Sequence, residues 1–215
     1  IFSDFDGTIV PDRMDNGFAA TLTAGEATLV PYTGLLNGAD NKITTLRATT
    51  TTKIQWPINS VPATLTMCSV SRYTDGQTGR ILTSLGSPGQ SFNFLHGHWG
   101  GSRGVARYGT PFITLNTNIA GPLSNWLVMC AISGGTVPTN AVVDQTDVGT
   151  YVTGPREPCQ LNVNSGPWVS DNELHSVYIW NVELSTVQIK HVTSALRAQI
   201  GGTPDFENTA VVPME

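Results

Sequence analysis

The sequence predicts an all-β protein, built from many short antiparallel strands with a single short helix near the C-terminus. Among its 215 residues are 22 Gly and 13 Pro, and Thr is more abundant than either. Thr fits a pleated sheet surface, whereas Gly and Pro interrupt strands at turns. The apolar spacing of an amphipathic helix is found in one stretch only, close to the C-terminus.

The first quarter of the chain predicts strands with one solvated face. We expect an edge strand at the N-terminus and a polar loop over residues 11–17. Thr alternates with apolar or small residues over residues 19–55, as in half-buried strands, and the Thr run 49–52 is interpreted as an exposed strand. The opening FSDFDGT also resembles the first motif of haloacid-dehalogenase-like phosphatases. Because the strand-helix alternation of that family does not follow, we interpret the match as a coincidence.

The middle of the chain continues as strands separated by turns. Residues 63–73 (ATLTMCSVSRY) predict a strand, which we expect to turn at residues 75–76 and to resume at 80–85. Residues 125–132 (NWLVMCAI) are apolar at every position except the first, which is typical of a central strand covered on both faces. Residues 141–153 predict a hairpin that turns at Asp144-Gln145.

The C-terminal region contains the predicted helix. Residues 174–182 (LHSVYIWNV) predict a strand, and Ser185 is followed three residues later by Gln188, the spacing of a capping box. One apolar stripe follows, and Gly201-Gly202 ends the helix; the stripe consists of Ile189, Val192, Leu196 and Ile200. We expect residues 1–202 to form one domain and residues 203–215 to be a C-terminal tail or linker.

Charge and periodicity exclude several classes of protein. The net charge is -5, the pI is near 5.3, and Lys42, Lys53 and Lys190 are the only lysines, so a nucleic-acid partner is not expected. No apolar run approaches the ~20 residues of a membrane helix, so membrane insertion is not expected. No period of 20 to 50 residues repeats, which favours a two-sheet antiparallel jelly-roll β-sandwich over a propeller. In that architecture we expect residues 125–132 to line a groove with one face.

Cysteine content leaves the redox state open. Cys68, Cys130 and Cys159 are an odd number, so at most one disulfide forms within the chain. Cys68 and Cys130 sit in apolar strand-like runs, where we expect buried free thiols in preference to a disulfide.

The stretch of residues 95–109 (LHGHWGGSRGVARYG) is the densest in polar chemistry. His96 and His98 are two apart and leave the same face of a strand, while Gly100-Gly101 permits the turn to a returning strand. The stretch therefore predicts a β-hairpin. We expect it to form one wall of the concave face.

Several motifs, taken in order, resemble a known family. The close of the chain, SVYIWNVELSTVQIKHVTSAL, is similar to the end of LamG-like jelly-roll domains of the concanavalin A-like lectin/glucanase superfamily. The hairpin at Val142-Val143-Asp144-Gln145 is similar to the hydrophobic-Val-Asp-Gly hairpin of that family, with Gln145 in place of Gly. TLTMCSVSRY, FLHGHWGGSRGVARY and NWLVMCA resemble a branch found in algal, protist and large-virus surface proteins. These motifs lie within residues 63–200.

The resemblance implies a β-sandwich that binds glycans or matrix proteins, and in some members degrades polysaccharides. The Glu-x-Asp-x-Glu strand of the family's glucanases is absent from this sequence. Some relatives bind Ca²⁺ through loop carboxylates, which Asp144, Asp147 or Asp171 could imitate here. We therefore expect no cofactor, with Ca²⁺ as the alternative.

For His96 and His98 three interpretations are open. A pair of His on one strand face suits Zn²⁺ or Cu²⁺, but His175 and His191, the other two, lie far away in the sequence. The preferred interpretation is a polar pair that lines a groove. The third interpretation is a structural role in which both imidazoles are hydrogen-bonded. We therefore predict a site without a metal.

The predicted ligand site combines aromatic platforms with hydrogen-bond donors. Aromatic rings stack on sugar faces, and guanidinium groups bind hydroxyls or uronate carboxylates. The predicted ligand-binding residues are His96, His98, Trp99, Arg103, Arg107 and Tyr108. The remaining Trp residues are assigned to packing, and they are Trp56, Trp126, Trp168 and Trp180.

Catalysis is the alternative function. A polysaccharide lyase needs a base and a group that neutralises a uronate. His96 or His98, Tyr108, and Arg103 or Arg107 form a chemically sensible set for these roles. A glycosidase needs two converging carboxylates, and the candidates are scattered along the chain: Glu26, Asp75, Glu157, Asp171 and Glu173.

The sequence as a whole favours recognition over reaction. We expect a module that binds a polysaccharide or glycoprotein glycan, or that is adhesive, within a larger extracellular, cell-surface or virion protein. A cell-wall polysaccharide-degrading enzyme on the same scaffold and a structural assembly domain without ligand are the alternatives.

Overall fold

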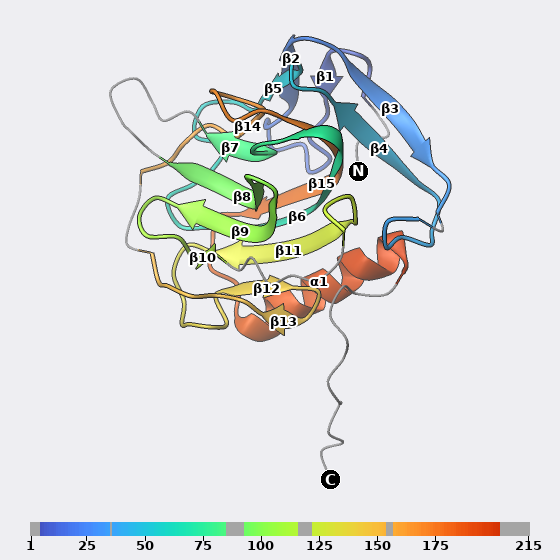
Figure 1. Ribbon diagram of the computed structural model, residues 1–215. Helices are drawn as coiled ribbons and strands as arrows, with labels where there is room; N and C mark the ends of the chain where they lie inside the picture. Colours follow the sequence, from blue (N-terminus) through green and yellow to red (C-terminus); the bar gives the residue numbers. More distant parts are fainter. Residues whose placement is uncertain (1–4, 35, 85–92, 116–121, 154–156, 203–215) are drawn as a thin grey trace.

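Two antiparallel sheets and one helix make up the part of the chain that the structure describes. The computed structural model describes residues 5–34, 36–84, 93–115, 122–153 and 157–202 (Figure 1). The predicted tail, residues 203–215, lies outside the described residues. The sheets have eight and seven strands and share an apolar core, so the predicted two-sheet β-sandwich with one short C-terminal helix is confirmed.

The eight-stranded sheet contains the predicted hairpin. Every strand pairs antiparallel with its neighbours. In spatial order the strands are β1 (Ile9–Val10), β2 (Ala20–Ala24), β5 (Lys53–Gln55), β14 (Asn162–Val163), β7 (Leu82–Ser84), β8 (Phe94–Trp99), β9 (Ser102–Tyr108) and β10 (Thr114–Leu115).

The seven-stranded sheet contains the two long central strands, β6 and β15. Its pairs are also antiparallel. In spatial order the strands are β13 (Thr146–Asp147), β12 (Ala141–Val143), β11 (Leu127–Ile132), β6 (Thr66–Thr78), β15 (Ser170–Trp180), β4 (Ile43–Ala48) and β3 (Ala27–Tyr32).

Alternation along β11 sorts its side chains between two apolar clusters. Leu127 and Met129 face the core between the sheets, whereas Val128 and Ile132 face outward and are also buried. The prediction of a strand covered on both faces is therefore confirmed. No groove lies on this strand, because the outward face packs against the helix α1 (Thr186–Ile200).

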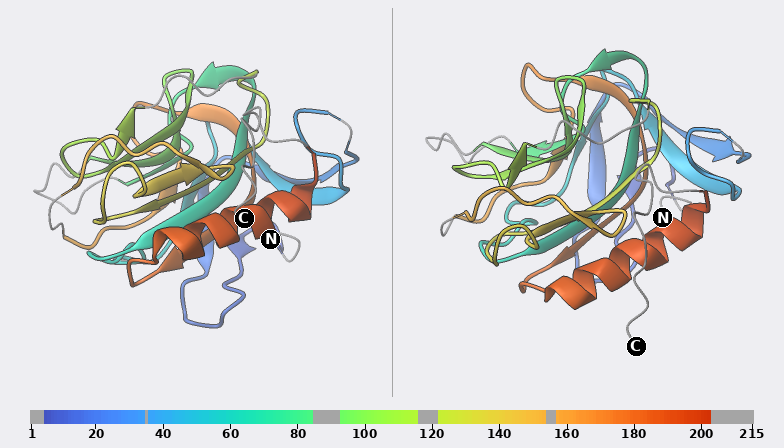
Figure 2. Two further views of the ribbon diagram at one scale, coloured as in Figure 1. Left: turned by 90° about the horizontal axis from the view of Figure 1, so that it is seen from below. Right: turned by 60° about the horizontal axis from the view of Figure 1, so that its bottom comes forward.

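Helix α1 lies along the outer face of the seven-stranded sheet (Figure 2). Ser185 caps it: the Ser185 hydroxyl accepts from Gln188 N, and Gln188 Oε1 accepts from Ser185 N at 2.8 Å, as the capping box predicts. Gly201 adopts a φ of 66° at the C-cap. The apolar stripe is confirmed, since Ile189, Leu196 and Ile200 are buried and Val192 packs against them.

Two local predictions about Thr49–52 and Asp75-Gly76 are wrong. Thr52 N donates to Thr49 O at 2.9 Å, so the Thr run is a tight turn whose last side chain is buried. Asp75-Gly76 lies inside β6 instead of between two strands. Tyr73 pairs with Asn172 and Thr78 with Ser170, so the extra residues bulge out of one continuous strand.

The expectation of free thiols at Cys68 and Cys130 is also wrong. The two residues are direct partners in the register of β6 and β11, with Cα atoms 4.1 Å apart, and they form a disulfide. Register between strands 62 residues apart cannot be read from an apolar pattern, which is why the pairing was not predictable. Cys159 is buried and lies outside this bond.

Among the described residues, no helix is long and apolar enough to cross a membrane.

Candidate functional site

The predicted hairpin of residues 95–109 forms as β8 and β9. Gly100 and Gly101 make the turn with φ values of 57° and 78°, and Trp99 pairs with Ser102 across it. The register shifts between Gly97 and His98, where Gly97 has a φ of 91°. The extra residue lies on β9, because Gly97 pairs with Val105 and His98 pairs with Arg103, which leaves Gly104 without a partner in the register.

Both imidazoles point into the core between the sheets. His96 Nδ1 lies 2.6 Å from the Tyr108 hydroxyl, and His98 Nδ1 lies 3.3 Å from Ser71 Oγ on β6. Tyr73 packs edge-on against the His98 ring, with the ring centroids 4.7 Å apart. His96 and His98 are fully buried. The polar face of the hairpin is therefore turned toward the opposite sheet.

Burial governs the protonation of this pair. Desolvation lowers the pKa of His96 to about 3. The pKa of His98 also falls well below 6.5, first through burial and then through the neighbouring Arg103 charge. Both imidazoles are therefore neutral near pH 7. Within the part of the chain that the structure describes, the Nε2 atom of His98 has no hydrogen-bond partner.

The six predicted ligand residues divide into an interior set and a surface set. His96, His98, Arg103 and Tyr108 are at most 2% exposed. Trp99 and Arg107 keep part of their surface in solvent. Contact of the four interior residues with a ligand, or their use in a lyase, stays a prediction.

Trp99 and Arg107 both contact Phe112 on the outside of the hairpin. Phe112 lies between them: its ring centroid is 5.6 Å from that of Trp99 and 4.8 Å from the Arg107 guanidinium carbon. Arg107 Nε donates to Gly109 O at 2.7 Å. These contacts hold the Arg107 side chain on the outer face of the eight-stranded sheet.

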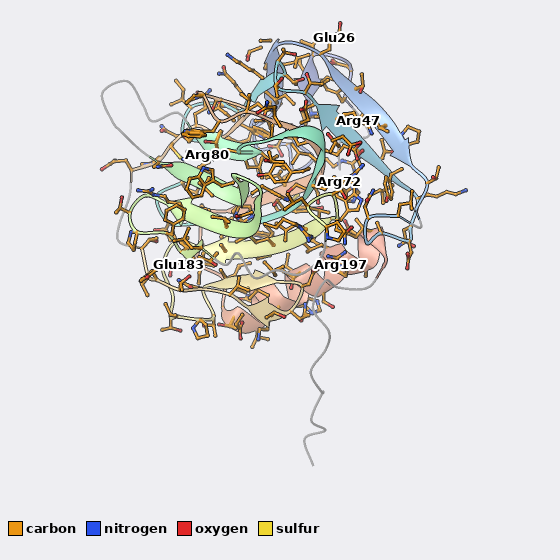
Figure 3. The ribbon with its side chains drawn as sticks, in the orientation of Figure 1. Glu26, Arg47, Arg72, Arg80, Glu183 and Arg197 are labelled. Carbon is orange, nitrogen blue, oxygen red and sulfur yellow. A yellow bond between two sulfur atoms is a disulfide. The ribbon has the colours of Figure 1, made fainter. Side chains whose placement is uncertain are left out.

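Arg107 lines a cleft of about 420 Å³ on this outer face, which we call the outer cleft. One wall comes from β7 and β9, and the other from the turn that joins β14 to β15. Figure 3 shows Arg80 on the same side of the molecule as β7, well separated from Arg47 and Arg72. The lining residues are Arg80, Thr83, Ser84, Asn93, Arg107, Thr110, Ser165, Gly166, Pro167 and Trp168.

Three buried polar atoms of the outer cleft lack a hydrogen-bond partner among the described residues. They are Arg80 Nε, Asn93 Oδ1 and Ser165 Oγ. A buried polar atom without a partner costs free energy, so three at one cleft indicate groups that an external molecule would satisfy. Burial, and then the charge of Arg107, lowers the pKa of Arg80.

The prediction that Trp168 serves packing is wrong, because its side chain is 53% exposed and lines the outer cleft. Ser165-Gly166-Pro167 precedes it, and those residue types mark a surface turn. That signal could have identified Trp168 as an exposed aromatic. Trp126 is fully buried, as predicted.

A second cleft, of about 460 Å³, brings together two of the scattered carboxylates. Asp75 and Asp171 both line it, beside Arg47 and Arg72. Asp171 serves the fold, since its oxygens accept from Gln77 N at 2.8 Å and from Thr50 N at 3.2 Å. The two arginines are also engaged, because fully buried Glu173 accepts from both of them.

The carboxylates suggested for Ca²⁺ are hydrogen-bonded within the chain. Asp144 forms a two-bond ion pair with Arg197, at 2.7 and 2.6 Å. Asp147 pairs with Lys190 at 2.9 Å. The described residues contain no group of three or more His, Cys, Asp or Glu that would hold a metal ion.

No protein-family model and no curated protein matches the sequence. Solved structures do show the same fold at low identity. Domain 4 of AbnA, a GH43 extracellular arabinanase from Geobacillus stearothermophilus in complex with arabinotriose, is 13% identical, with a TM-score of 0.57 over 85% of this chain and 91% of that domain. The binding domain of Paraclostridial Mosquitocidal Protein 1 is 11% identical, with a TM-score of 0.56 over 88% of this chain and 52% of that one.

A sialidase has a similar region. Trypanosoma rangeli sialidase in complex with sialic acid is 15% identical, with a TM-score of 0.58 over 91% of this chain. The match covers 32% of the sialidase, so this chain corresponds to about a third of that enzyme. The chain thus shares its β-sandwich fold with a domain of an arabinanase, a region of a sialidase and the binding domain of a mosquitocidal protein.

Proposed function

We propose that this chain is a glycan-binding or adhesive module within a larger extracellular, cell-surface or virion protein, and that the outer cleft is its binding site. The observation that carries the proposal is the composition of that cleft. An exposed indole stands beside three buried polar atoms that lack partners among the described residues. A sugar has apolar C–H faces for the first feature and hydroxyls for the second.

The sandwich neighbours support this proposal. One is a domain of an arabinanase in complex with arabinotriose, and another is a region of a sialidase that was solved with sialic acid. The Cys68–Cys130 disulfide suits an oxidising compartment, which supports the proposed extracellular location. The proposal does not use the interior imidazoles, whose burial separates them from solvent.

The test is retention on immobilised plant and algal cell-wall polysaccharides, followed by a glycan array. We expect retention without new reducing ends and without unsaturated ends absorbing at 235 nm. Cleavage would support the enzyme instead. If the protein is not retained and does not cleave the polysaccharides, the result contradicts the proposal and favours a structural role.

Substitution of Trp168 localises the site. Trp168→Ala removes the exposed ring, so we expect affinity for the retained glycan to fall about tenfold, whereas Trp168→Phe keeps a stacking ring and most of the affinity. The control is Val187→Ala. The Val187 side chain is 78% exposed and lies on α1, which covers the seven-stranded sheet and not the sheet that forms the outer cleft. Equal affinities for Trp168→Ala and Val187→Ala would place binding elsewhere.

A further inference from the structure

The described residues of the outer cleft carry two positive charges and no negative one. Arg80 and Arg107 both line it, and none of the described lining residues is Asp or Glu. The net charge of the whole chain is -5, so this local excess of positive charge opposes the overall balance.

The arginines of the second cleft show the opposite arrangement. Arg47 and Arg72 both donate to Glu173, at 2.7 and 2.9 Å from their Nε atoms, so that a carboxylate of the chain balances them. No such ion pair involves Arg80 or Arg107 among the described residues. Arg80 Nε is enclosed and still lacks an acceptor there.

From this contrast we propose that Arg80 and Arg107 bind the acidic group of a sugar, a carboxylate or a sulfate, while its ring stacks on Trp168. The inference rests on the glycan-binding function proposed above and names the class of glycan. An oxyanion would supply the acceptor that Arg80 Nε lacks and would reduce the repulsion between the two guanidinium groups. Ser165 Oγ and Asn93 Oδ1 remain for neighbouring hydroxyls.

The geometry of the donors suits an oxyanion. A guanidinium group offers a planar fork of N–H donors that matches a carboxylate or a sulfate edge. Arg107 is already fixed by Gly109 O at 2.7 Å and by the Phe112 ring, so binding orders few further side-chain torsions. The overall negative charge of the protein disfavours indiscriminate adsorption of polyanions, so any preference for acidic glycans would be local to the cleft.

The experiment compares matched glycans by isothermal titration calorimetry. One pair is oligogalacturonate and its methyl ester, which differ in the carboxylate charge. A second pair is chondroitin sulfate and chemically desulfated chondroitin, which differ in the sulfate. We expect the wild-type protein to bind at least one acidic member about tenfold more tightly than its uncharged or desulfated counterpart, with affinity falling as NaCl rises.

Two variants and one control assign the effect to the cleft. Arg80→Gln and Arg107→Gln each remove one donor fork, so we expect about a tenfold loss for the acidic glycan and little change for the neutral one. Lys42→Gln removes the same charge from the segment before β4 in the other sheet and should leave both affinities unchanged. Circular dichroism would verify that each variant is folded.

The outcomes separate this inference from the function on which it rests. Loss of acidic preference in both arginine variants supports the inference. The pair of glycans that shows the preference in the wild type then identifies the bound group as a carboxylate or a sulfate. Binding of neutral glycans through Trp168 without any acidic preference overturns the inference and leaves the glycan-binding function standing. Acidic preference that survives Arg80→Gln and Arg107→Gln also overturns it. Absence of binding to every glycan overturns both.

Discussion

Acidification should destabilise the fold through the buried imidazoles, and His96 allows the effect to be measured. His96 is fully buried, and desolvation lowers its pKa to about 3, whereas an imidazole in an unfolded chain titrates near 6.5. Above pH 6.5 both states are neutral, and His96 makes no pH-dependent contribution. Below pH 6.5 the His96 imidazole binds a proton in the unfolded chain but not in the native state. The free energy of unfolding therefore falls as the pH is lowered, until the pH reaches the native pKa of His96.

The expected magnitude follows from one proton bound by the unfolded state alone. Each pH unit below 6.5 lowers the free energy of unfolding by about 1.4 kcal/mol per imidazole, so His96 accounts for about 2 kcal/mol at pH 5. His98 has its pKa lowered in the same direction and adds a loss of its own. Asp6 and Asp12 contribute little in this window, because their pKa values are lowered from 3.8.

The assay is urea unfolding followed by Trp fluorescence at pH 7.5 and pH 5.0, with the disulfide intact. His96→Gln keeps a hydrogen-bonding group for the Tyr108 hydroxyl and removes the titration. Its loss of stability between the two pH values should be smaller than that of the wild type by about 2 kcal/mol. His191→Gln, on the exposed side of α1, is the control for the substitution. An equal loss in His96→Gln and in the wild type would refute the reasoning.

Two further predictions concern the disulfide within the seven-stranded sheet and the ion pair that joins the β12–β13 turn to α1. Replacing Cys68 and Cys130 by Ala opens a loop of 62 residues, so we expect the free energy of unfolding to fall by up to about 4 kcal/mol in urea titrations. Cys159→Ala is the control, and an equal loss there would contradict a specific role for the disulfide. Asp144→Asn leaves Arg197 buried without its countercharge, which should cost about 3 kcal/mol. The companion change Lys190→Gln removes a partly exposed pair and should cost about 1 kcal/mol or less, so similar losses would argue against burial as the cause.

Local sequence patterns were sufficient to predict the elements that depend on residues close together in the chain. The apolar run of residues 125–132 predicted a strand covered on both faces, and Ser185 with Gln188 predicted the start of α1. Gly100-Gly101 and Asp144-Gln145 predicted two turns, and positive φ values occur at all four residues. In each case the determinant is a propensity or a periodicity carried by neighbouring residues.

The candidate site was only partly predictable. Arg107 was named from the sequence and lines the outer cleft, whereas Arg80, Ser165 and Trp168 were not connected with it. These residues come from β9, from the segment before β7, and from the turn after β14. Their proximity is a consequence of strand order in the eight-stranded sheet, which no local pattern encodes.

The sequence by itself determined the type of fold, the helix boundaries and the dense polar hairpin, since these depend on periodicity and turn chemistry. The tertiary structure decided what the hairpin faces and which cysteines pair. The packing of β8 against the other sheet encloses both imidazoles in the core, and the register of β6 against β11 places Cys68 opposite Cys130. Side chains alternate with a period of two along a strand, so a shift of one residue exchanges the inner and outer faces. Only the paired sheets fix that register.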